Sequence, residues 1–141
     1  IGQSEQAHLD AIAVLLERYG LAAPAPAAPG VFANADLQAL YTDLVARGGQ
    51  SAAEALQVGG LIEEVDLQDL GTRLAQTDQA DIQQVYTNLQ AGSENHLRAF
   101  ARGLARQTGA AYQPQVLSQE AGQAILAGNP GNGAGSRGGR P

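Results

Sequence analysis

Imidazole and carboxylate groups are the side chains that could carry chemistry in this sequence. It has two histidines, His8 and His96, and no cysteine, which excludes disulfides, thiolate metal sites and cysteine nucleophiles. Glu5 and His8 are three residues apart, a spacing that places both side chains on one side of a helix. Carboxylate-bridged metal centres in four-helix bundles use the same Glu-x-x-His spacing. The sequence therefore offers two metal ligands on its first helix.

Helical periodicity places these groups among hydrophobic residues. Three segments carry apolar side chains at alternating steps of three and four, the pattern of a helix with one buried face. Each stripe also contains a polar residue able to bind a metal: Glu5 and His8 in 1–20, Glu63 in 51–76 and His96 in 79–108. We therefore expect Glu5, His8, Glu63 and His96 to converge inside a helical bundle.

Three neighbours of these residues bear on the site. Glu64 is turned about 100° away from Glu63 around the helix, so it lies off the stripe. Asp66 follows Glu63 by three residues and could flank it. Ser93 stands where a second Glu-x-x-His motif would need a carboxylate. A symmetric two-metal centre would therefore be short of a ligand.

A bound transition metal would account for polar groups on buried stripes. An unpaired buried carboxylate costs several kcal/mol, and this cost falls only if the charge is paired or coordinated. Imidazole and carboxylate together suit iron, manganese, zinc or copper. The alternative is a surface network of salt bridges or a core histidine with ordinary hydrogen-bond partners, the usual explanation for an isolated Glu-x-x-His.

The elements that must position these residues are expected to be helical. Alternating β-branched runs, typical of strands, are missing. Asn34, Ser51 and Ser118 are N-cap residues by type, and Gly20 and Gly109 are suited to end a helix. The sequence predicts an all-α fold with three substantial helices and two short ones. Their expected bounds are 1–20, 34–47, 51–76, 79–108 and 119–127.

Two further patterns predict how the helices meet. Gly59 and Gly60 lie in the middle of a predicted helix, where each costs about 1 kcal/mol relative to alanine. We interpret them as a point of close helix packing. Arg98, Arg102 and Arg106 form a row at steps of four, which we interpret as a solvated face that pairs with acidic residues.

Composition limits the classes of partner. The chain of 141 residues has a net charge of −6, and all of its eight basic residues are arginine, so nucleic-acid binding is not expected. No apolar run approaches the roughly 20 residues that span a bilayer. We expect a helical domain over 1–127 with an Ala/Pro linker at 21–33, followed by a Gly-rich tail at 128–141 that contacts a neighbouring subunit or a groove of its own chain.

Four segments resemble a family whose function is not known. They are SEQAHLDAIAVLLERYGL (4–21), ALQVGGLIEEVDLQDL (55–70), TDQADIQQVYTNLQAGSENHLRAF (77–100) and YQPQVLSQE (112–120). These segments are similar to a bacterial and archaeal branch of the ferritin-like superfamily, distantly related to rubrerythrin. The similarity covers most of 1–127.

This resemblance implies a ferritin-like helical bundle and metal binding, with iron as the first expectation, without implying a particular reaction. Glu5 and His8 then match the second helix of that bundle, Glu63 the third and His96 the fourth. Family members carry an additional Glu-rich helix before this point, so we expect an apolar groove where that helix would pack. A partner chain could fill the groove.

Two functions of different classes follow. The first is a metal-binding ferritin-like protein with di-iron-type or other redox activity, in which case any enzyme would be an oxidoreductase. The second is a structural subunit of a homo-oligomer or extracellular filament, with the termini making contacts between subunits. A plain interaction module is a third reading. An extracellular or cell-surface location is slightly favoured over a cytoplasmic one.

Overall fold

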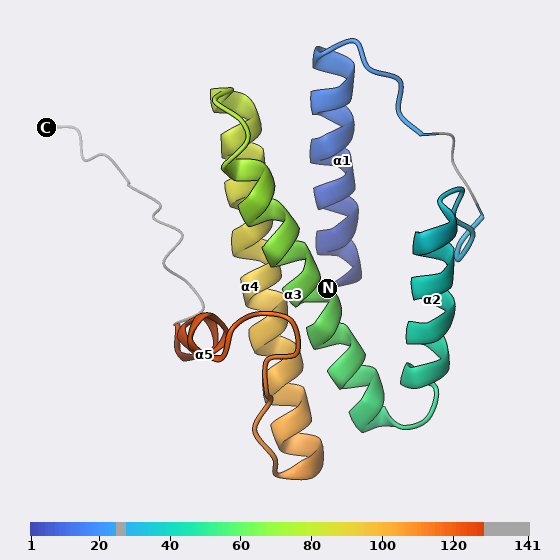
Figure 1. The fold of residues 1–141 in the computed structure, drawn as a ribbon, viewed down its shortest axis with the longest axis vertical. Helices are drawn as coiled ribbons and strands as arrows, with labels where there is room; N and C mark the ends of the chain where they lie inside the picture. Colours follow the sequence, from blue (N-terminus) through green and yellow to red (C-terminus); the bar gives the residue numbers. More distant parts are fainter. Residues whose placement is uncertain (25–27, 129–141) are drawn as a thin grey trace, which may run out of the picture.

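The computed structural model describes residues 1–24 and 28–128, and five helices make up its regular structure. They are α1 (Gly2–Arg18), α2 (Ala35–Gly48), α3 (Ala52–Leu74), α4 (Ala80–Thr108) and α5 (Gln119–Ala127) (Figure 1). The described residues contain no strand, so the all-α prediction is confirmed. The prediction for the tail concerns residues that, apart from Gly128, lie outside the described part of the chain.

Local chemistry sets the ends of the helices. The side chain of Asn34 accepts hydrogen bonds from two backbone amides of α2, and Ser51 and Ser118 each accept one at the starts of α3 and α5. Gly20 adopts φ +66 just beyond α1, and Gly109 adopts φ +77 at the end of α4. Only glycine takes this left-handed conformation at little cost, so both helices stop where the sequence predicts.

The hairpin of α3 and α4 forms the centre of the molecule. Neither Gly59 nor Gly60 has room for a side chain, because an added Cβ would lie 2.3 Å from the Phe100 ring and 2.5 Å from the Tyr112 ring, respectively. The predicted close helix packing is therefore confirmed at Gly59, which faces α4, whereas Gly60 makes room for the Tyr112 ring from the connection between α4 and α5. The core around it consists of Leu67, Leu97, Leu104 and Tyr112.

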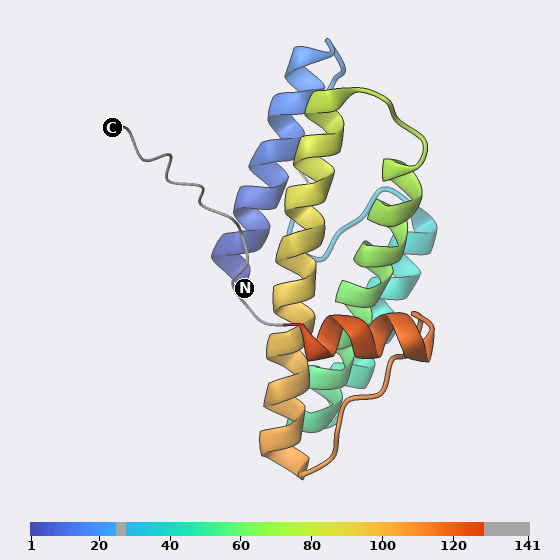
Figure 2. The same ribbon diagram turned by 90° about the vertical axis from the view of Figure 1, so that its left-hand side faces the viewer.

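Helix α1 lies against α4 and runs antiparallel to it (Figures 1 and 2). At the end of α1, Arg18 and the hydroxyl of Tyr19 both bind the Asp81 carboxylate, at 2.7 and 2.9 Å. Near the start of α1, the His8 ring occupies the space beside Gly92. These contacts fix the register of the two helices along their length.

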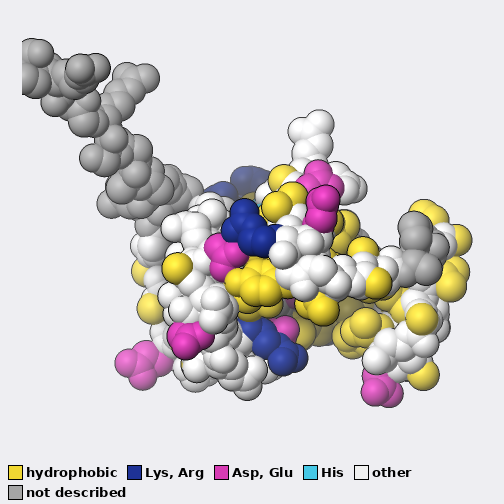
Figure 3. Space-filling model, turned by 90° about the horizontal axis from the view of Figure 1, so that it is seen from above, with side chains coloured by type: hydrophobic (Ala, Val, Ile, Leu, Met, Phe, Trp, Pro, Cys, Tyr) yellow, Lys and Arg dark blue, Asp and Glu magenta, His cyan; other side chains and the backbone are white. Residues whose placement is uncertain are grey.

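Helix α2 follows a long connection from α1 and packs on α3 (Figure 1). Arg47 at its end pairs with Glu54 in the first turn of α3, at 2.8 Å. The contact between α2 and α3 leaves many hydrophobic side chains of α2 exposed, including Leu37, Leu40 and Val45. Figure 3 shows hydrophobic side chains gathered under the segment that links α1 to α2.

Helix α5 crosses the α3/α4 hairpin and covers a second face of it (Figure 2). Its last turn is held by Arg98, whose Nη1 donates a hydrogen bond of 3.0 Å to the Ile125 carbonyl. Arg98 is only 7% exposed. The prediction of a solvated arginine row is therefore wrong for Arg98, because α5 covers that position, whereas Arg102 and Arg106 are exposed as expected.

None of the helices in the described residues is both long enough and apolar enough to cross a membrane.

Candidate metal centre

Three helices bring one polar side chain each to a common point. Glu5 comes from α1, Glu63 from α3 and His96 from α4, and each offers a donor atom within 4.8 Å of the other two. The antiparallel register explains the meeting. Since His8 lies beside Gly92 on α4, Glu5 one turn earlier comes level with His96 one turn later.

The donor atoms are spaced as ligands of one cation would be. His96 Nδ1 lies 2.8 Å from Glu5 Oε1 and 3.4 Å from Glu63 Oε1. Two atoms that each bind the same ion at about 2.1 Å lie roughly 3 to 3.5 Å apart, depending on the coordination angle. The observed spacings are close to this range.

Two of these atoms have no hydrogen-bond partner among the described residues. Glu5 Oε1 and His96 Nδ1 are both buried, and their approach to 2.8 Å does not have the direction of a hydrogen bond. Buried polar atoms are almost always paired, because an unpaired one loses its hydration without compensation. The donor set of two carboxylates and an imidazole therefore fits a transition metal, which would satisfy both atoms.

Burial controls the charges at this cluster. Glu63 is 5% exposed, and its burial, followed by the nearby charge of Glu5, raises its pKa to about 8, while the Ser93 hydroxyl acts in the opposite direction. Burial lowers the pKa of His96, against the charge of Glu5, which raises it. Both pKa shifts favour the uncharged forms of these side chains. A metal ion would therefore have to displace a proton from Glu63, whereas it could bind the neutral imidazole of His96 directly.

Comparison with known proteins identifies the family. Residues 1–129 match the family described as "Uncharacterized protein domain (DUF2202)". The chain belongs to this family. The predicted resemblance to a family of unknown function is thereby confirmed.

One relative of this DUF2202 chain comes from the archaeon Methanocaldococcus jannaschii. It is the uncharacterized protein MJ0754, which is 43% identical over 127 residues, or 89% of this chain and 68% of the relative. The crystal structure of hypothetical protein MJ0754 superposes with a TM-score of 0.86 at 42% identity, over 92% of this chain and 74% of that one. The helical-bundle architecture of the DUF2202 chain is therefore that of an experimentally determined structure.

His8, the fourth predicted ligand, lies beside the cluster rather than in it. Its Nδ1 is 3.2 Å from Glu5 Oε2, within hydrogen-bond distance, and its ring centroid is 5.9 Å from that of His96. The Glu5 carboxylate thus stands between two imidazoles, with one oxygen directed at each. Three of the four predicted residues converge on one point, and the fourth contacts one of the three.

A groove between α1 and α3 gives access to the cluster in the DUF2202 chain. It has a volume of about 660 Å³. Glu5, His8, Ser93, Asp66 and Asp69 supply its polar lining. Its remaining walls are hydrophobic: Leu9, Ile12, Phe32, Leu70 and Leu89. The site is therefore open to solvent on one side and bounded by apolar surface.

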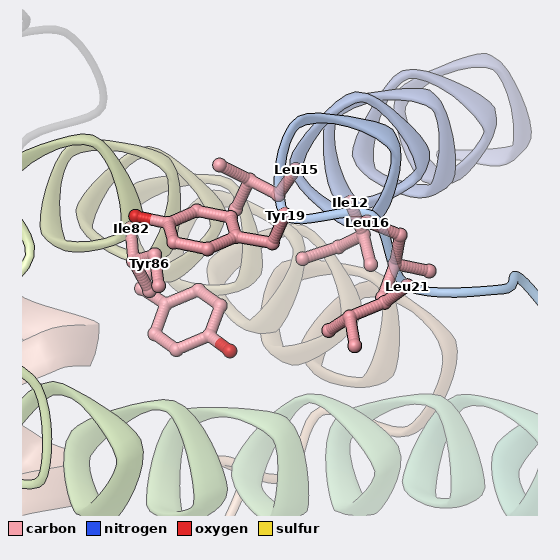
Figure 4. Close-up of a pocket in the computed structure, with 7 residues that line it drawn as sticks. All are labelled: Ile12, Leu15, Leu16, Tyr19, Leu21, Ile82 and Tyr86. Carbon is pink, nitrogen blue, oxygen red and sulfur yellow. The ribbon is translucent and has the colours of Figure 1, made fainter.

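A smaller apolar pocket lies at the other end of α1. It has a volume of about 190 Å³ and its lining consists of aliphatic side chains and the rings of Tyr19 and Tyr86 (Figure 4). This lining includes no carboxylate and no imidazole, so it offers no metal ligand of those types. The acid–imidazole cluster is accordingly the better candidate for chemistry.

Sequence reasoning missed the role of Glu64, which faces away from the cluster but is fully buried. Its carboxylate accepts hydrogen bonds from the Tyr112 hydroxyl and from the backbone amides of Gln115, Val116 and Leu117. These partners lie about 50 residues further along the chain, and backbone amides leave no mark in a sequence pattern. Asp66, in contrast, lines the groove as its spacing from Glu63 suggests.

Proposed function

We propose that this chain binds a transition metal, with Glu5, Glu63 and His96 as ligands and iron as the first expectation. The observation that supports this most directly is the pair of buried, unpartnered atoms, Glu5 Oε1 and His96 Nδ1, 2.8 Å apart. Nitrogen and oxygen donors of this type also suit manganese, zinc and copper. With three ligands from the chain, a bound ion would keep coordination positions for water or a substrate.

The chain's own residues would prepare the site for this ion. Glu63 and His96 are held on the α3/α4 hairpin, whose two helices make the most extensive contact in the fold, whereas Glu5 comes from α1. His8 contacts the outer oxygen of Glu5 and would keep that carboxylate turned toward His96. If the ion is iron, it would supply redox chemistry, and the activity would be that of an oxidoreductase.

We also propose that the bundle is of the ferritin-like type. The pairing of Glu5 and His8 on one helix, with single ligands from α3 and α4, supports this interpretation. In that arrangement Ser93 takes the place of a carboxylate, so the two halves of the centre differ.

Metal analysis of purified protein tests the proposal. Protein freed of metal with a chelator should recover about one equivalent or more of Fe²⁺ under anaerobic conditions, measured by elemental analysis after gel filtration. Glu63→Gln and His96→Ala should each lose it, and Glu120→Gln, an exposed carboxylate on α5, is the matched control. The proposal is wrong if the unaltered protein retains none of Fe²⁺, Mn²⁺, Zn²⁺ or Cu²⁺.

We propose as a second function that the chain associates with a second copy of itself. The supporting observation is a continuous apolar face. Phe32 lines the groove beside α1, Tyr41 lines a second groove between α2 and α3, and their rings are 5.4 Å apart. Contiguous exposed hydrophobic surface of this kind marks interfaces, whereas scattered exposed hydrophobics are ordinary.

Sedimentation equilibrium tests self-association. The full chain should sediment as a dimer or larger assembly, and Val45→Glu or Ile62→Glu, both on the apolar face, should shift it to a monomer. Gln84→Glu, on the exposed surface of α4, should leave the assembly unchanged. A monomer at millimolar concentration of unaltered protein contradicts this second function.

A further inference from the structure

A separate pocket lies between α4, α5 and the segment that joins them. It has a volume of about 310 Å³, and its lining shares no residue with the groove that leads to the metal cluster. Arg98 and Arg102 of α4 supply its charged lining, and none of the described residues that line it is acidic. Its other walls are largely apolar: Ala101, Ala105, Ala111, Leu126 and the Tyr112 ring. Apolar walls with a few convergent polar groups are typical of small-molecule sites.

Arg98 is the fixed member of the arginine pair, because its guanidinium is held on two sides. Its side chain is 8% exposed. Nη1 donates a hydrogen bond of 3.0 Å to the Ile125 carbonyl of α5, and Nη2 donates one of 2.8 Å to Asn95 Oδ1. Nε is buried and has no hydrogen-bond partner among the described residues. A buried donor without a partner loses its hydration without compensation, so an acceptor is missing beside Arg98.

The charges of these two arginines are less well balanced than those of the arginines on other helices. The single arginines of α1, α2 and α3 each contact a carboxylate, at 2.7, 2.8 and 3.2 Å. Arg98 has only a long contact of 3.5 Å with Glu94, and Arg102 has no ion-pair partner within residues 1–24 and 28–128. The pocket therefore keeps an excess of positive charge in a chain whose net charge is −6.

The sequence that follows the pocket does not supply the missing negative charge. Gly128 lines the pocket, and a Cβ added there would lie 3.3 Å from Arg98 Nη1. Residues 129–141 contain no aspartate or glutamate, and they include two further arginines, Arg137 and Arg140. This segment therefore brings no acidic side chain that could serve as the counter-ion.

From this arrangement we infer that the pocket binds a small organic monocarboxylate with an apolar body. Guanidinium groups match the geometry of carboxylates, so the ligand would give Arg98 Nε its acceptor. Arg102 lies one turn further along α4, is exposed, and would close on the same carboxylate from the solvent side. A single negative charge fits because Glu94 already offsets part of the charge of Arg98. The inference is independent of the proposed metal binding.

Binding of para-fluorobenzoate to the full chain, followed by ¹⁹F NMR, tests this inference. The unaltered chain should bind it saturably, and Arg102→Gln should weaken the affinity by about tenfold, because a charge-assisted contact is lost. Arg106→Gln is the matched control, since it removes the same charge from the same helix at a position that does not line the pocket. Its affinity should change by less than about twofold. If Arg98 serves only to hold the last turn of α5, no variant should bind the probe.

Two further measurements locate the bound carboxylate and define its chemistry. The Nε–H signal of Arg98 in ¹H–¹⁵N spectra should shift downfield on addition of para-fluorobenzoate, because Nε gains an acceptor, and the Arg106 signal should not. The uncharged para-fluorobenzamide should bind about tenfold more weakly, and inorganic phosphate at equal concentration should not displace para-fluorobenzoate.

Three results would overturn the inference. They are the absence of saturable binding, an equal loss of affinity in Arg102→Gln and Arg106→Gln, and displacement by phosphate. None of them bears on the metal cluster, because Glu5, Glu63 and His96 lie outside this pocket.

Discussion

The Tyr112 hydroxyl donates a hydrogen bond of 2.7 Å to the carboxylate of Glu64, a side chain with no exposed surface. The same carboxylate accepts three consecutive backbone amides, from Gln115, Val116 and Leu117. It thereby satisfies the amides of a segment that has no regular structure of its own. A single acidic residue of α3 thus fastens the connection between α4 and α5 to the hairpin.

Replacing Glu64 with glutamine should destabilise the protein strongly. The amide keeps the shape of the side chain but presents an NH₂ group to backbone donors, and the charge-assisted hydrogen bonds are lost. We expect the free energy of unfolding to fall by about 3 kcal/mol in urea denaturation.

The exposed Glu120→Gln is the control for Glu64→Gln and should stay within about 0.5 kcal/mol of the unaltered protein. Equal stabilities for the two variants would show that the buried carboxylate does not anchor the 115–117 amides.

Adding one methyl group at Gly59 should also destabilise the fold. A Cβ there would lie 2.3 Å from the Phe100 ring, so α3 and α4 would have to separate. Overpacking of this kind costs about 1 to 3 kcal/mol, measured as the shift in thermal or urea unfolding.

Gly71→Ala on the same helix is the matched control for Gly59→Ala. Its nearest neighbour would be the Gln90 amide nitrogen at 3.6 Å, an ordinary contact. Helix propensity should then make this variant as stable as the original or about 1 kcal/mol more stable.

Stability of the metal-free protein should fall as the pH rises from about 7 to 8.5. The pKa of Glu63 is raised to about 8 in the folded chain from 4.5, so the folded state retains a proton that the unfolded state has already released. The stabilisation is complete below the unfolded pKa of 4.5, declines as the pH rises above it, and is lost once the pH has passed about 8. Thermal unfolding across this range measures the effect.

Two comparisons isolate Glu63 as the source. Glu63→Gln should flatten the pH dependence, because it has no proton to lose. The lowered pKa of His96 makes the stability of the fold rise with pH, which is the opposite effect. This rise ends near pH 6.5, where the histidine of the unfolded chain has lost its proton, so it lies below the range measured. A slope that persists in Glu63→Gln assigns the titration to another group.

Gly92→Ala should weaken metal binding without removing a ligand. A Cβ at this position would lie 2.6 Å from His8 Nε2, so the imidazole would have to turn away from Glu5. Displacing a residue that orients or shares a ligand typically costs 10- to 100-fold in affinity, so we expect a loss of about tenfold in a Co²⁺ titration. Gly71→Ala should bind as the unaltered protein does.

Periodicity predicted the helices and one buried face of each, and this was enough to bring Glu5, Glu63 and His96 together. It could not predict the roles of Glu64 and Arg98. Both lie off the main stripes, and both are buried because α5 and the segment before it cover a second face of the hairpin. The position of that cover depends on contacts between residues far apart in the chain, which one helix's periodicity does not encode.

Helix α1 touches α4 but is kept apart from α3 by the open groove, and it nevertheless carries Glu5 and His8. Undocking this one helix would remove the ligand Glu5 and the His8 ring that orients it in a single motion, without disturbing the α3/α4 hairpin. The affinity for the ion would then depend on the free energy with which α1 docks against α4. A bound ion would stabilise the docked position of α1. Amide hydrogen exchange along α1 would then slow as the affinity for the ion increases.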